Sequence, residues 1–272
     1  MKRLLANMST RINVDRLQTD LHSKRFGRRI IFLREAGSTI DVAKQLADYG
    51  AEEGTVVTAE VQTAGRGRMG RSWVSPKGGL YLSVILKPKI SPKKAVRLVF
   101  LFGLAVAEIL HELYEMTVET KWPNDVLVNG KKICGILTEM NTTGEKVNYV
   151  IAGIGVNANF DGEKVFPEEL RKAATSLENE LGRKVELEEL FKALLGKLES
   201  FYEIFLKEGF SRILADWKKY ACFLGCEVEV ASGTEKWVGI ASDVGSDGAL
   251  ILKLNDETVK RVFFGDVTLR LR

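Results

Sequence analysis

Gly65-Arg66-Gly67-Arg68-Met69-Gly70-Arg71 alternates glycine with arginine directly after residues 55–61, a β-branched stretch that is typical of a strand. Glycine lets the backbone approach a ligand closely and leaves amide groups free to face an anion. Arg66, Arg68 and Arg71 add guanidinium groups that suit a phosphate or a carboxylate. The spacing differs from the dinucleotide fingerprint and from the Walker loop. This glycine-arginine loop (residues 65–71) therefore predicts phosphate handling; taken alone, a basic surface turn is the alternative.

The sequence around this loop predicts strands and helices in irregular alternation. Residues 30–33 and 80–86 are predicted strands, and Ser38 is a predicted N-cap for a helix over residues 41–49. Apolar residues at helical spacing predict one long helix over residues 93–113. Short strands are then expected at residues 118–120, 126–128, 133–139 and 147–153. The pattern indicates an α+β fold with a mixed central sheet and packed helices.

The last third of the chain changes character after residue 222. Two amphipathic helices, over residues 187–206 and 210–220, precede five short predicted strands at residues 228–230, 237–241, 250–254, 259–264 and 267–271. Short strands punctuated by glycine suggest a small β-barrel. We therefore divide the chain into a short, basic, helical extension (1–28), a catalytic domain (29–222) and a C-terminal domain (223–272).

Composition indicates a globular enzyme. The 272 residues are 45% hydrophobic and 28% charged, and the net charge of +4 permits an anionic ligand without indicating a nucleic-acid binder. Three cysteines without paired spacing favour a reducing setting, and two histidines do not support a zinc site. We expect a soluble, cytoplasmic protein, because neither a signal peptide nor an apolar run of membrane-spanning length is evident.

A second motif, Lys121-Trp122-Pro123-Asn124-Asp125, places a cation, an aromatic ring, a rigid turn, an amide and a carboxylate together. Pro123 fixes the turn, Trp122 offers a stacking face, and Asp125 suits a metal ion or a lysine. The alternative is an ordinary connection between strands that carries a buried tryptophan. Lys132 follows one predicted hairpin later, which concentrates cations near the same strand ends.

Together these segments resemble the biotin protein ligases. The loop with its neighbours Gln62-Thr63-Ala64 and Ser72-Trp73 is similar to that family's glycine-arginine loop, and the motif at residues 121–125 matches its second signature at every position. Lys132 with residues 134–137 resembles its Lys-x-x-Gly-Ile-Leu strand, and residues 153–159 its Gly-Ile-Gly-x-Asn-x-Asn segment. Residues 239–267 are similar to its SH3-like accessory domain.

The resemblance implies a catalytic domain like those of class II synthetases and biotin/lipoate ligases, with an SH3-like C-terminal barrel. It implies that biotin and ATP form biotinyl-5′-AMP and pyrophosphate, after which a lysine of a biotin carboxyl carrier protein attacks the mixed anhydride. Mg²⁺ would bridge the nucleotide phosphates. The expected catalytic residues are Lys132 and Arg68, which offset developing charge, and Asp125, which orients the incoming lysine.

The same resemblance implies two sets of binding residues. The expected biotin contacts are Ser38, Thr39, Ile40, Gln62, Arg66, Gly67, Arg68, Lys132 and Gly135. The expected ATP and adenylate contacts are Arg66, Arg68, Arg71, Trp73, Trp122, Asn124 and Asn157. Strand alternation would place Cys134 on the same face as Lys132, lining the pocket in a packing role.

Two departures from the family pattern qualify these expectations. Ile40 stands where the family usually has asparagine, which leaves only a backbone contact to biotin. Regulatory members carry an N-terminal winged helix-turn-helix, which a basic segment of 28 residues is too short to form. We therefore interpret residues 12–29 as a linker remnant of such a domain and expect no specific DNA partner. The alternatives are a lipoate or octanoate ligase-type transferase and a bifunctional ligase and repressor; monomer and homodimer both stay open.

Overall fold

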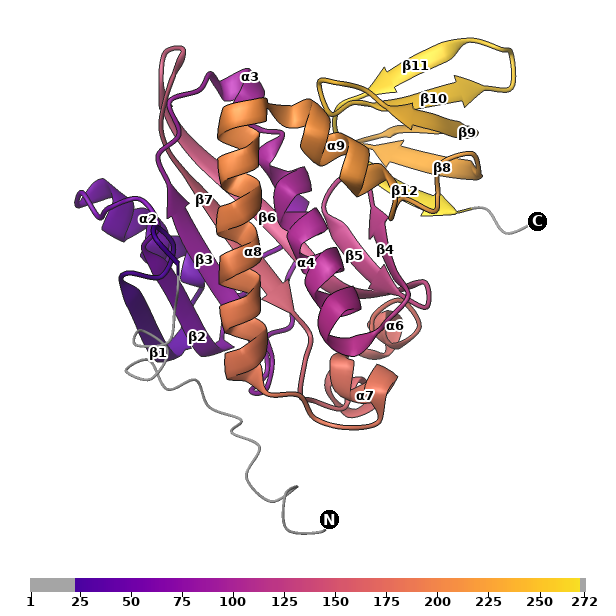
Figure 1. The fold of residues 1–272 in the computed structure, drawn as a ribbon. Helices are drawn as coiled ribbons and strands as arrows, with labels where there is room; N and C mark the ends of the chain where they lie inside the picture. Colours follow the sequence, from indigo (N-terminus) through magenta and orange to yellow (C-terminus); the bar gives the residue numbers. More distant parts are fainter. Residues whose placement is uncertain (1–22, 270–272) are drawn as a thin grey trace.

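The fold is taken from a computed structural model that describes residues 23–269 (Figure 1). Within that range, a seven-stranded sheet has the order β1-β2-β3-β7-β6-β5-β4, and a five-stranded sheet follows with the order β11-β10-β9-β8-β12. β1 and β2 pair in parallel, whereas the other neighbours pair antiparallel. The predicted α+β fold with a mixed central sheet is confirmed. The predicted helix in the extension lies mostly outside the described residues.

The elements have the following bounds. The large sheet consists of β1 (Ile30–Ala36), β2 (Val56–Gln62), β3 (Leu80–Leu86), β4 (Val118–Lys121), β5 (Asp125–Val128), β6 (Lys131–Thr143) and β7 (Lys146–Val156). The helices are α2 (Thr39–Asp48), α3 (Pro92–Ala95), α4 (Leu98–Tyr114), α5 (Gly162–Val165), α6 (Glu168–Arg171), α7 (Leu177–Leu181), α8 (Leu187–Glu208) and α9 (Phe210–Lys218), with a 3-10 turn, η1, at Arg68–Gly70. The C-terminal sheet consists of β8 (Glu227–Ser232), β9 (Glu235–Val244), β10 (Leu250–Leu254), β11 (Val259–Val262) and β12 (Asp266–Leu269).

Helices cover both faces of the large sheet, and β3 shows how its residues divide between them. Four alternate residues belong to the larger hydrophobic core, which α4 and α8 cover: Leu80, Leu82, Val84 and Leu86. Ile85 belongs to the smaller core under α2. Successive side chains of a strand point to opposite faces, so a continuously apolar strand suits a sheet that is covered twice. α4 and α8 lie side by side in front of the sheet in Figure 1.

Most predicted elements are present, and one is interrupted. The helix expected over residues 93–113 is divided into α3 and α4 at Val96 and Arg97. Both residues keep right-handed helical angles, with φ of −58° and −77°, so the apolar spacing continues across the break and could not show it. Asn129 and Gly130 have φ of 51° and 72°, as expected for the tight hairpin turn between β5 and β6.

The C-terminal sheet contacts the catalytic domain at the turn between β4 and β5. Trp122 is buried there, and its Nε1 donates a 3.0 Å hydrogen bond to the carbonyl of Gly248, between β9 and β10. An ion pair of 2.6 Å between Lys218 of α9 and Asp243 of β9 adds a second connection. The five predicted strands are confirmed as an antiparallel sheet beside the end of the large sheet (Figure 1).

The segment just before β1 is attached to α8 by one carboxylate. Glu199 is 8% exposed, and it accepts hydrogen bonds from the backbone N–H groups of Lys24, Arg25 and Phe26 and from the Ser23 hydroxyl. Burial raises the pKa of Glu199, but these hydrogen bonds outweigh it and hold the pKa below its usual value. Residues 23–26, assigned from sequence to the extension, therefore pack on the catalytic domain.

Glu199→Gln is expected to lower the free energy of unfolding by about 1–3 kcal/mol at neutral pH, because an amide NH₂ replaces one acceptor oxygen. A lowered pKa means that the carboxylate contributes stability above its ordinary pKa and loses it as the pH falls through the folded-state value. The difference in the free energy of unfolding between Glu199→Gln and wild type should thus become smaller in acid. Urea denaturation at several pH values measures this difference. Glu203→Gln on the same helix is the control, and an equal loss in both variants would contradict the expectation.

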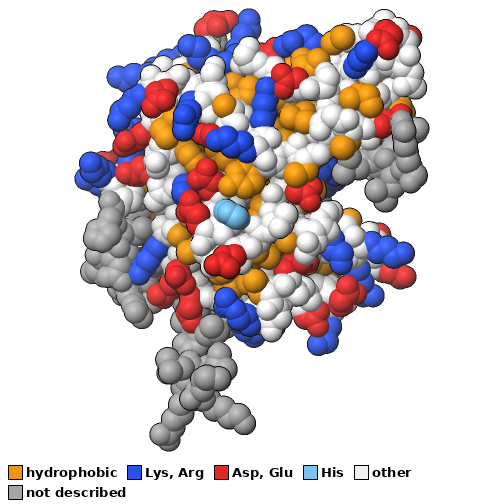
Figure 2. Space-filling view, turned by 45° about the vertical axis from the view of Figure 1, so that its right-hand side comes forward, with side chains coloured by type: hydrophobic (Ala, Val, Ile, Leu, Met, Phe, Trp, Pro, Cys, Tyr) orange, Lys and Arg blue, Asp and Glu red, His pale blue; other side chains and the backbone are white. Residues whose placement is uncertain are grey.

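Charges of both signs are distributed over the surface. Figure 2 shows one face, on which acidic and basic side chains alternate with hydrophobic ones and neither sign dominates, in keeping with the net charge of +4. Over residues 23–269, the helices fall short of the length and apolar character that a membrane span requires. The apolar helix α4 is explained by its packing between α8 and the large sheet.

Candidate active site

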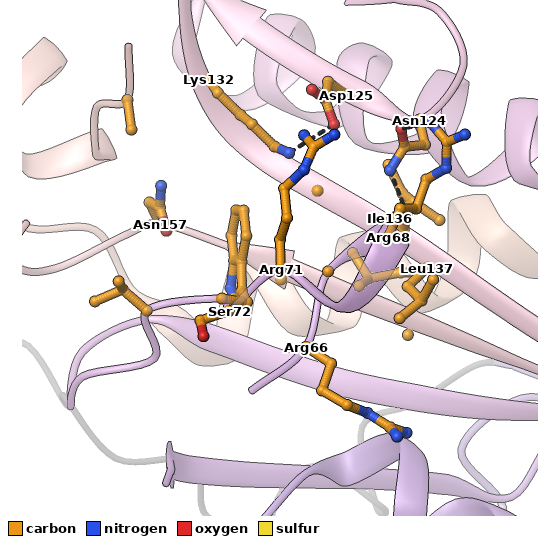
Figure 3. A pocket seen from close by; sticks show the side chains of 18 of the residues that line it. Arg66, Arg68, Arg71, Ser72, Asn124, Asp125, Lys132, Ile136, Leu137 and Asn157 are labelled. Carbon is orange, nitrogen blue, oxygen red and sulfur yellow. Dashed lines mark hydrogen bonds and ion pairs between the residues drawn. The ribbon is translucent and has the colours of Figure 1, made fainter. Parts of the chain in front are cut away.

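A cavity of about 330 Å³ lies on the α2 side of the large sheet, within the size range of small-ligand sites. Its walls come from the start of α2, the glycine-arginine loop, β5 to β7, the segment 166–174 and Asp266 of β12. Figure 3 shows the polar side chains that surround it. Segments from both domains therefore meet around one cavity.

Glycines form the floor of this cavity. Gly135 of β6 lies directly opposite Gly155 of β7, and Gly153 follows on the same face. A Cβ atom added to Gly155 would lie 2.4 Å from Trp73 Nε1, and one added to Gly153 would lie 2.6 Å from Ile40 Cδ1. Any larger residue would thus displace the loop or the first turn of α2.

Lys132 enters the cavity because of a β-bulge. In the pairing of β5 with β6, Val126 is opposite Cys134 but Leu127 is opposite Lys132, so Ile133 is an extra residue. The bulge reverses the alternation: Lys132 Nζ reaches Asp125 Oδ1 at 2.7 Å, while Cys134 is fully buried in the large core. The expectation that Cys134 lines the pocket is wrong. Burial raises the pKa of its thiol far above the usual value.

The end of the cavity at α2 is a connected set of hydrogen bonds. The Ser38 hydroxyl caps α2 by accepting from the Ile40 N–H. The backbone N–H and the hydroxyl of Thr39 both donate to Gln62 Oε1, at 2.9 and 3.1 Å, and Ser83 Oγ donates to Thr39 Oγ1 at 2.8 Å. Gln62 Nε2 in turn donates to Ser75 Oγ at 2.9 Å. These bonds fix which donors and acceptors face a ligand.

Arg68 and Arg71 of the loop lie between the two domains. Arg68 Nη1 donates to Asn124 Oδ1 and to the carbonyl of Gly265, each at 3.2 Å. Arg71 forms an ion pair with Asp266, whose Oδ1 is 4.0 Å from Arg68 Nη1. Burial lowers the pKa of Arg68, and nearby Asp266 and Asp125 oppose that effect. A half-buried guanidinium so placed favours an anionic ligand.

Arg66 points to the opposite side of the loop. Its Nη2 is 2.7 Å from Asp41 Oδ1 and 3.2 Å from Glu139 Oε1, and Figure 3 shows the guanidinium turned away from Lys132 and Asp125. The first arginine of the loop therefore contacts α2 and β6, whereas Arg68 and Arg71 contact the C-terminal domain.

Two buried polar atoms of the cavity have neither a hydrogen bond nor an ion pair within the described part of the chain: Trp73 Nε1 and Asn157 Oδ1. Trp73 packs over the glycine floor with Lys132 Nζ 5.2 Å from the centre of its ring. Asn157 donates through Nδ2 to the Thr175 carbonyl at 2.9 Å, which leaves its oxygen free to accept. Unsatisfied buried groups are rare in proteins, so a donor and an acceptor in one cavity indicate ligand contacts.

Comparison with known proteins agrees with this geometry. Residues 35–157 match the Biotin/lipoate A/B protein ligase family, and residues 223–270 match the biotin protein ligase C-terminal domain. The bifunctional ligase/repressor BirA of Bacillus subtilis (strain 168) is 35% identical over 260 residues, which cover 95% of this chain and 79% of that protein. The chain belongs to the biotin protein ligase family.

Other members of the family match over most of their length. A biotin–[acetyl-CoA-carboxylase] ligase of Mycobacterium tuberculosis is 33% identical over 247 residues, 88% of each chain. The structure of a biotin protein ligase from Aquifex aeolicus in complex with biotin and ATP superposes with a TM-score of 0.76 at 30% identity, covering 89% of this chain and 99% of that one. The suspected family membership is confirmed.

The structure brings nearly all of the predicted site residues to this cavity. Its lining includes Ser38, Thr39, Ile40, Gln62, Arg66, Gly67, Arg68, Arg71, Trp73, Asn124, Asp125, Lys132, Gly135 and Asn157. Trp122 is the one predicted site residue that is not part of this lining. It is 2% exposed and bonded to Gly248, so the expectation that it stacks on the nucleotide is wrong, and the alternative of a buried tryptophan in a strand connection is correct.

Several lining residues were not expected from the sequence. Lys121, Leu127, Gly153, Gly155, Phe166, Leu170, Ala173, Ala174 and Asp266 also border the cavity. The segment 166–174 comes near Lys132 because the Lys132 N–H donates to the Ala173 carbonyl and its carbonyl accepts from the Thr175 N–H. No local pattern indicates such a long-range contact. Gly265 and Asp266 did carry a signal, since they belong to the family resemblance of the C-terminal domain.

Proposed function

We propose that this chain activates biotin with ATP to biotinyl-5′-AMP and transfers the biotinyl group to a lysine of a biotin carboxyl carrier protein. The observation that carries the proposal is one cavity with a hydrogen-bonded amide and hydroxyl set at Thr39 and Gln62 and a cationic set at Lys132 and Arg68. The Aquifex aeolicus relative, which has the same fold at 30% identity, binds biotin and ATP. Biotin would direct its ureido group to the first set and its carboxylate to the second.

The first step joins two anions. A carboxylate oxygen of biotin attacks the α-phosphorus of ATP, the bond to the β-phosphate breaks, and pyrophosphate leaves with the electron pair. Lys132 is held 2.7 Å from Asp125, so its charge has a fixed position in the cavity, and we assign it to the point where the two anions would meet. A preorganised cation of this kind lowers the barrier because it requires no reorganisation during the reaction.

The second step needs a neutral amine. The carrier lysine attacks the acyl carbon of the mixed anhydride, the acyl–oxygen bond breaks, and AMP leaves. Asp125 is the cavity carboxylate nearest to Lys132, and we assign it the orientation of the incoming amine and acceptance of its proton. No covalent enzyme intermediate is required.

An apolar wall of the cavity suits the adenine ring. Phe166, Leu170, Ala173 and Ala174 line it, and Asn157 Oδ1 lies at the same end of the cavity as a free acceptor. A flat aromatic base gains burial from such a wall, and its exocyclic amine needs one acceptor. The glycine-arginine loop motif carries no information about this proposed adenine subsite.

Mg²⁺ is proposed to enter with the nucleotide and to offset phosphate charge. Among the described residues, no cluster of three or more metal-ligating side chains occurs, whereas Asp125 and Asp266 both border the cavity. Mg²⁺ commonly keeps several waters and binds substrate phosphates, so the nucleotide would supply most of its ligands, whereas Asp125 and Asp266 are already paired with Lys132 and Arg71.

Pyrophosphate release tests the proposal. Incubation with ATP and biotin should release pyrophosphate, and addition of a carrier domain should produce a biotinylated lysine detectable by mass spectrometry. Lipoate in place of biotin is the control for the related transferases, and release with lipoate alone would overturn the assignment. A gel-shift assay for specific operator binding tests the repressor alternative, and size-exclusion chromatography with biotin and ATP tests dimer formation.

A further inference from the structure

Asp266 is the cavity residue that belongs to the last strand of the chain. It forms an ion pair with Arg71, 195 positions earlier, and its Oδ1 lies 4.0 Å from Arg68 Nη1. The neighbouring carbonyl of Gly265 accepts a hydrogen bond from Arg68 at 3.2 Å. Two consecutive residues of the C-terminal domain therefore hold two arginines of the loop.

Apart from the hydrogen bond from Arg68 to Asn124, the loop has few other contacts that fix its position on that side. None of the residues of η1 is buried, and Met69 is 63% exposed. At its start, Arg66 is held on the catalytic domain by Asp41 and Glu139. A segment with few buried apolar contacts opens easily, so ion pairs at its two ends decide how often it is closed.

The C-terminal domain is a firm support for such a contact. The Trp122–Gly248 hydrogen bond and the Lys218–Asp243 ion pair both connect it to the catalytic domain. The side chain of Asp266 is not needed for its own sheet, because β12 pairs with β8 through backbone groups. The carboxylate instead pairs with Arg71 and lies 4.0 Å from Arg68.

We propose that Asp266 is a positioning residue that latches the glycine-arginine loop over the cavity, so that the C-terminal domain sets how long the activated intermediate is retained. The retention part rests on the proposed function, whereas the latch itself does not. The carboxylate holds Arg71 and leaves the remaining N–H groups of Arg68 to face a ligand phosphate.

Limited trypsin digestion tests the latch without any activity assay, because trypsin cleaves after arginine. Asp266→Asn should increase cleavage after Arg68 and Arg71 about threefold to fivefold, the scale of one partly exposed ion pair. The increase should disappear at high salt, which screens the pair in wild type as well. Glu257→Gln is the matched control, since it removes an ion pair with Lys253 that lies within the C-terminal domain, and it should leave cleavage of the loop unchanged.

Leakage of biotinyl-5′-AMP tests the consequence. Asp266→Asn should release the intermediate about threefold faster, while the rate of its formation changes less than about twofold. The double variant Asp266→Asn with Arg71→Gln should release the intermediate no faster than Arg71→Gln alone, because both substitutions remove the same ion pair. Wild-type cleavage and wild-type leakage in Asp266→Asn would overturn the latch. Slower adenylation without faster cleavage would overturn it too. Absence of any intermediate from wild-type protein would instead contradict the proposed function, and the digestion would still decide the latch.

Discussion

Lys132→Ala is expected to slow the formation of biotinyl-5′-AMP by about two orders of magnitude, the loss that follows removal of one preorganised charge stabiliser. The reason lies in its surroundings. Its Nζ is 2.7 Å from Asp125 and 5.2 Å from the centre of the Trp73 ring, so its charge is held at a defined position in the cavity. Single-turnover release of pyrophosphate measures the step directly.

A neighbouring lysine provides the control for this variant. Lys131 precedes Lys132 on β6 but does not line the cavity, so Lys131→Ala should adenylate biotin at a nearly normal rate. Biotin affinity, measured by calorimetry, should change far less than the rate in Lys132→Ala, because the ureido end of the site is untouched. Near-normal adenylation by Lys132→Ala would show that another group handles the charge.

Arg68→Ala is expected to release biotinyl-5′-AMP about tenfold to a hundredfold faster than wild type, the range for one hydrogen bond to a charged group. Arg68 is the most deeply placed arginine of the loop, with a side chain that is 21% exposed against 57% for Arg71. Its loss also removes the contacts to Asn124 and Gly265, so the loop loses its main support over the cavity.

Free intermediate, separated from protein by rapid filtration, measures this release. Arg71→Ala serves as the graded control, and its leakage should fall between that of wild type and that of Arg68→Ala, because a more exposed charge interacts more weakly. Equal leakage from wild type and Arg68→Ala would show that the loop does not retain the intermediate. Leakage that is faster in Arg71→Ala than in Arg68→Ala would make Arg71 the main retaining residue of the loop.

Local sequence patterns located most elements of the fold, whereas the family resemblance supplied most of the cavity residues. β-branched and apolar runs locate the strands, and Asn129-Gly130 locates the hairpin, because both signals act within a few residues. The Ser38 cap is equally local. The glycine and arginine residues of the loop suit an anion by their chemistry, but the loop alone left a basic surface turn open until the family resemblance favoured a ligand.

The errors came from contacts that no short pattern contains. The sequence around Trp122 suggests a ring that stacks on a ligand, but its indole N–H donates a hydrogen bond to the carbonyl of Gly248, 126 positions later. Cys134 was placed by strand alternation, which a single extra residue reverses. Asp266 reaches the cavity only because two separate sheets pack together. Partners far along the chain decided the positions of Trp122 and Asp266, and one extra residue decided that of Cys134, so local periodicity could not predict them.

Because of the bulge at Ile133, the position of Lys132 in the site depends on the number of residues in β6 as well as on their identities. If all residues of β6 were kept but paired regularly with β5, Lys132 would lie on the same face as Cys134, and its amine would point into the hydrophobic core. A designer who transplants the motif onto another β-sheet must therefore copy the irregularity of the backbone together with the lysine.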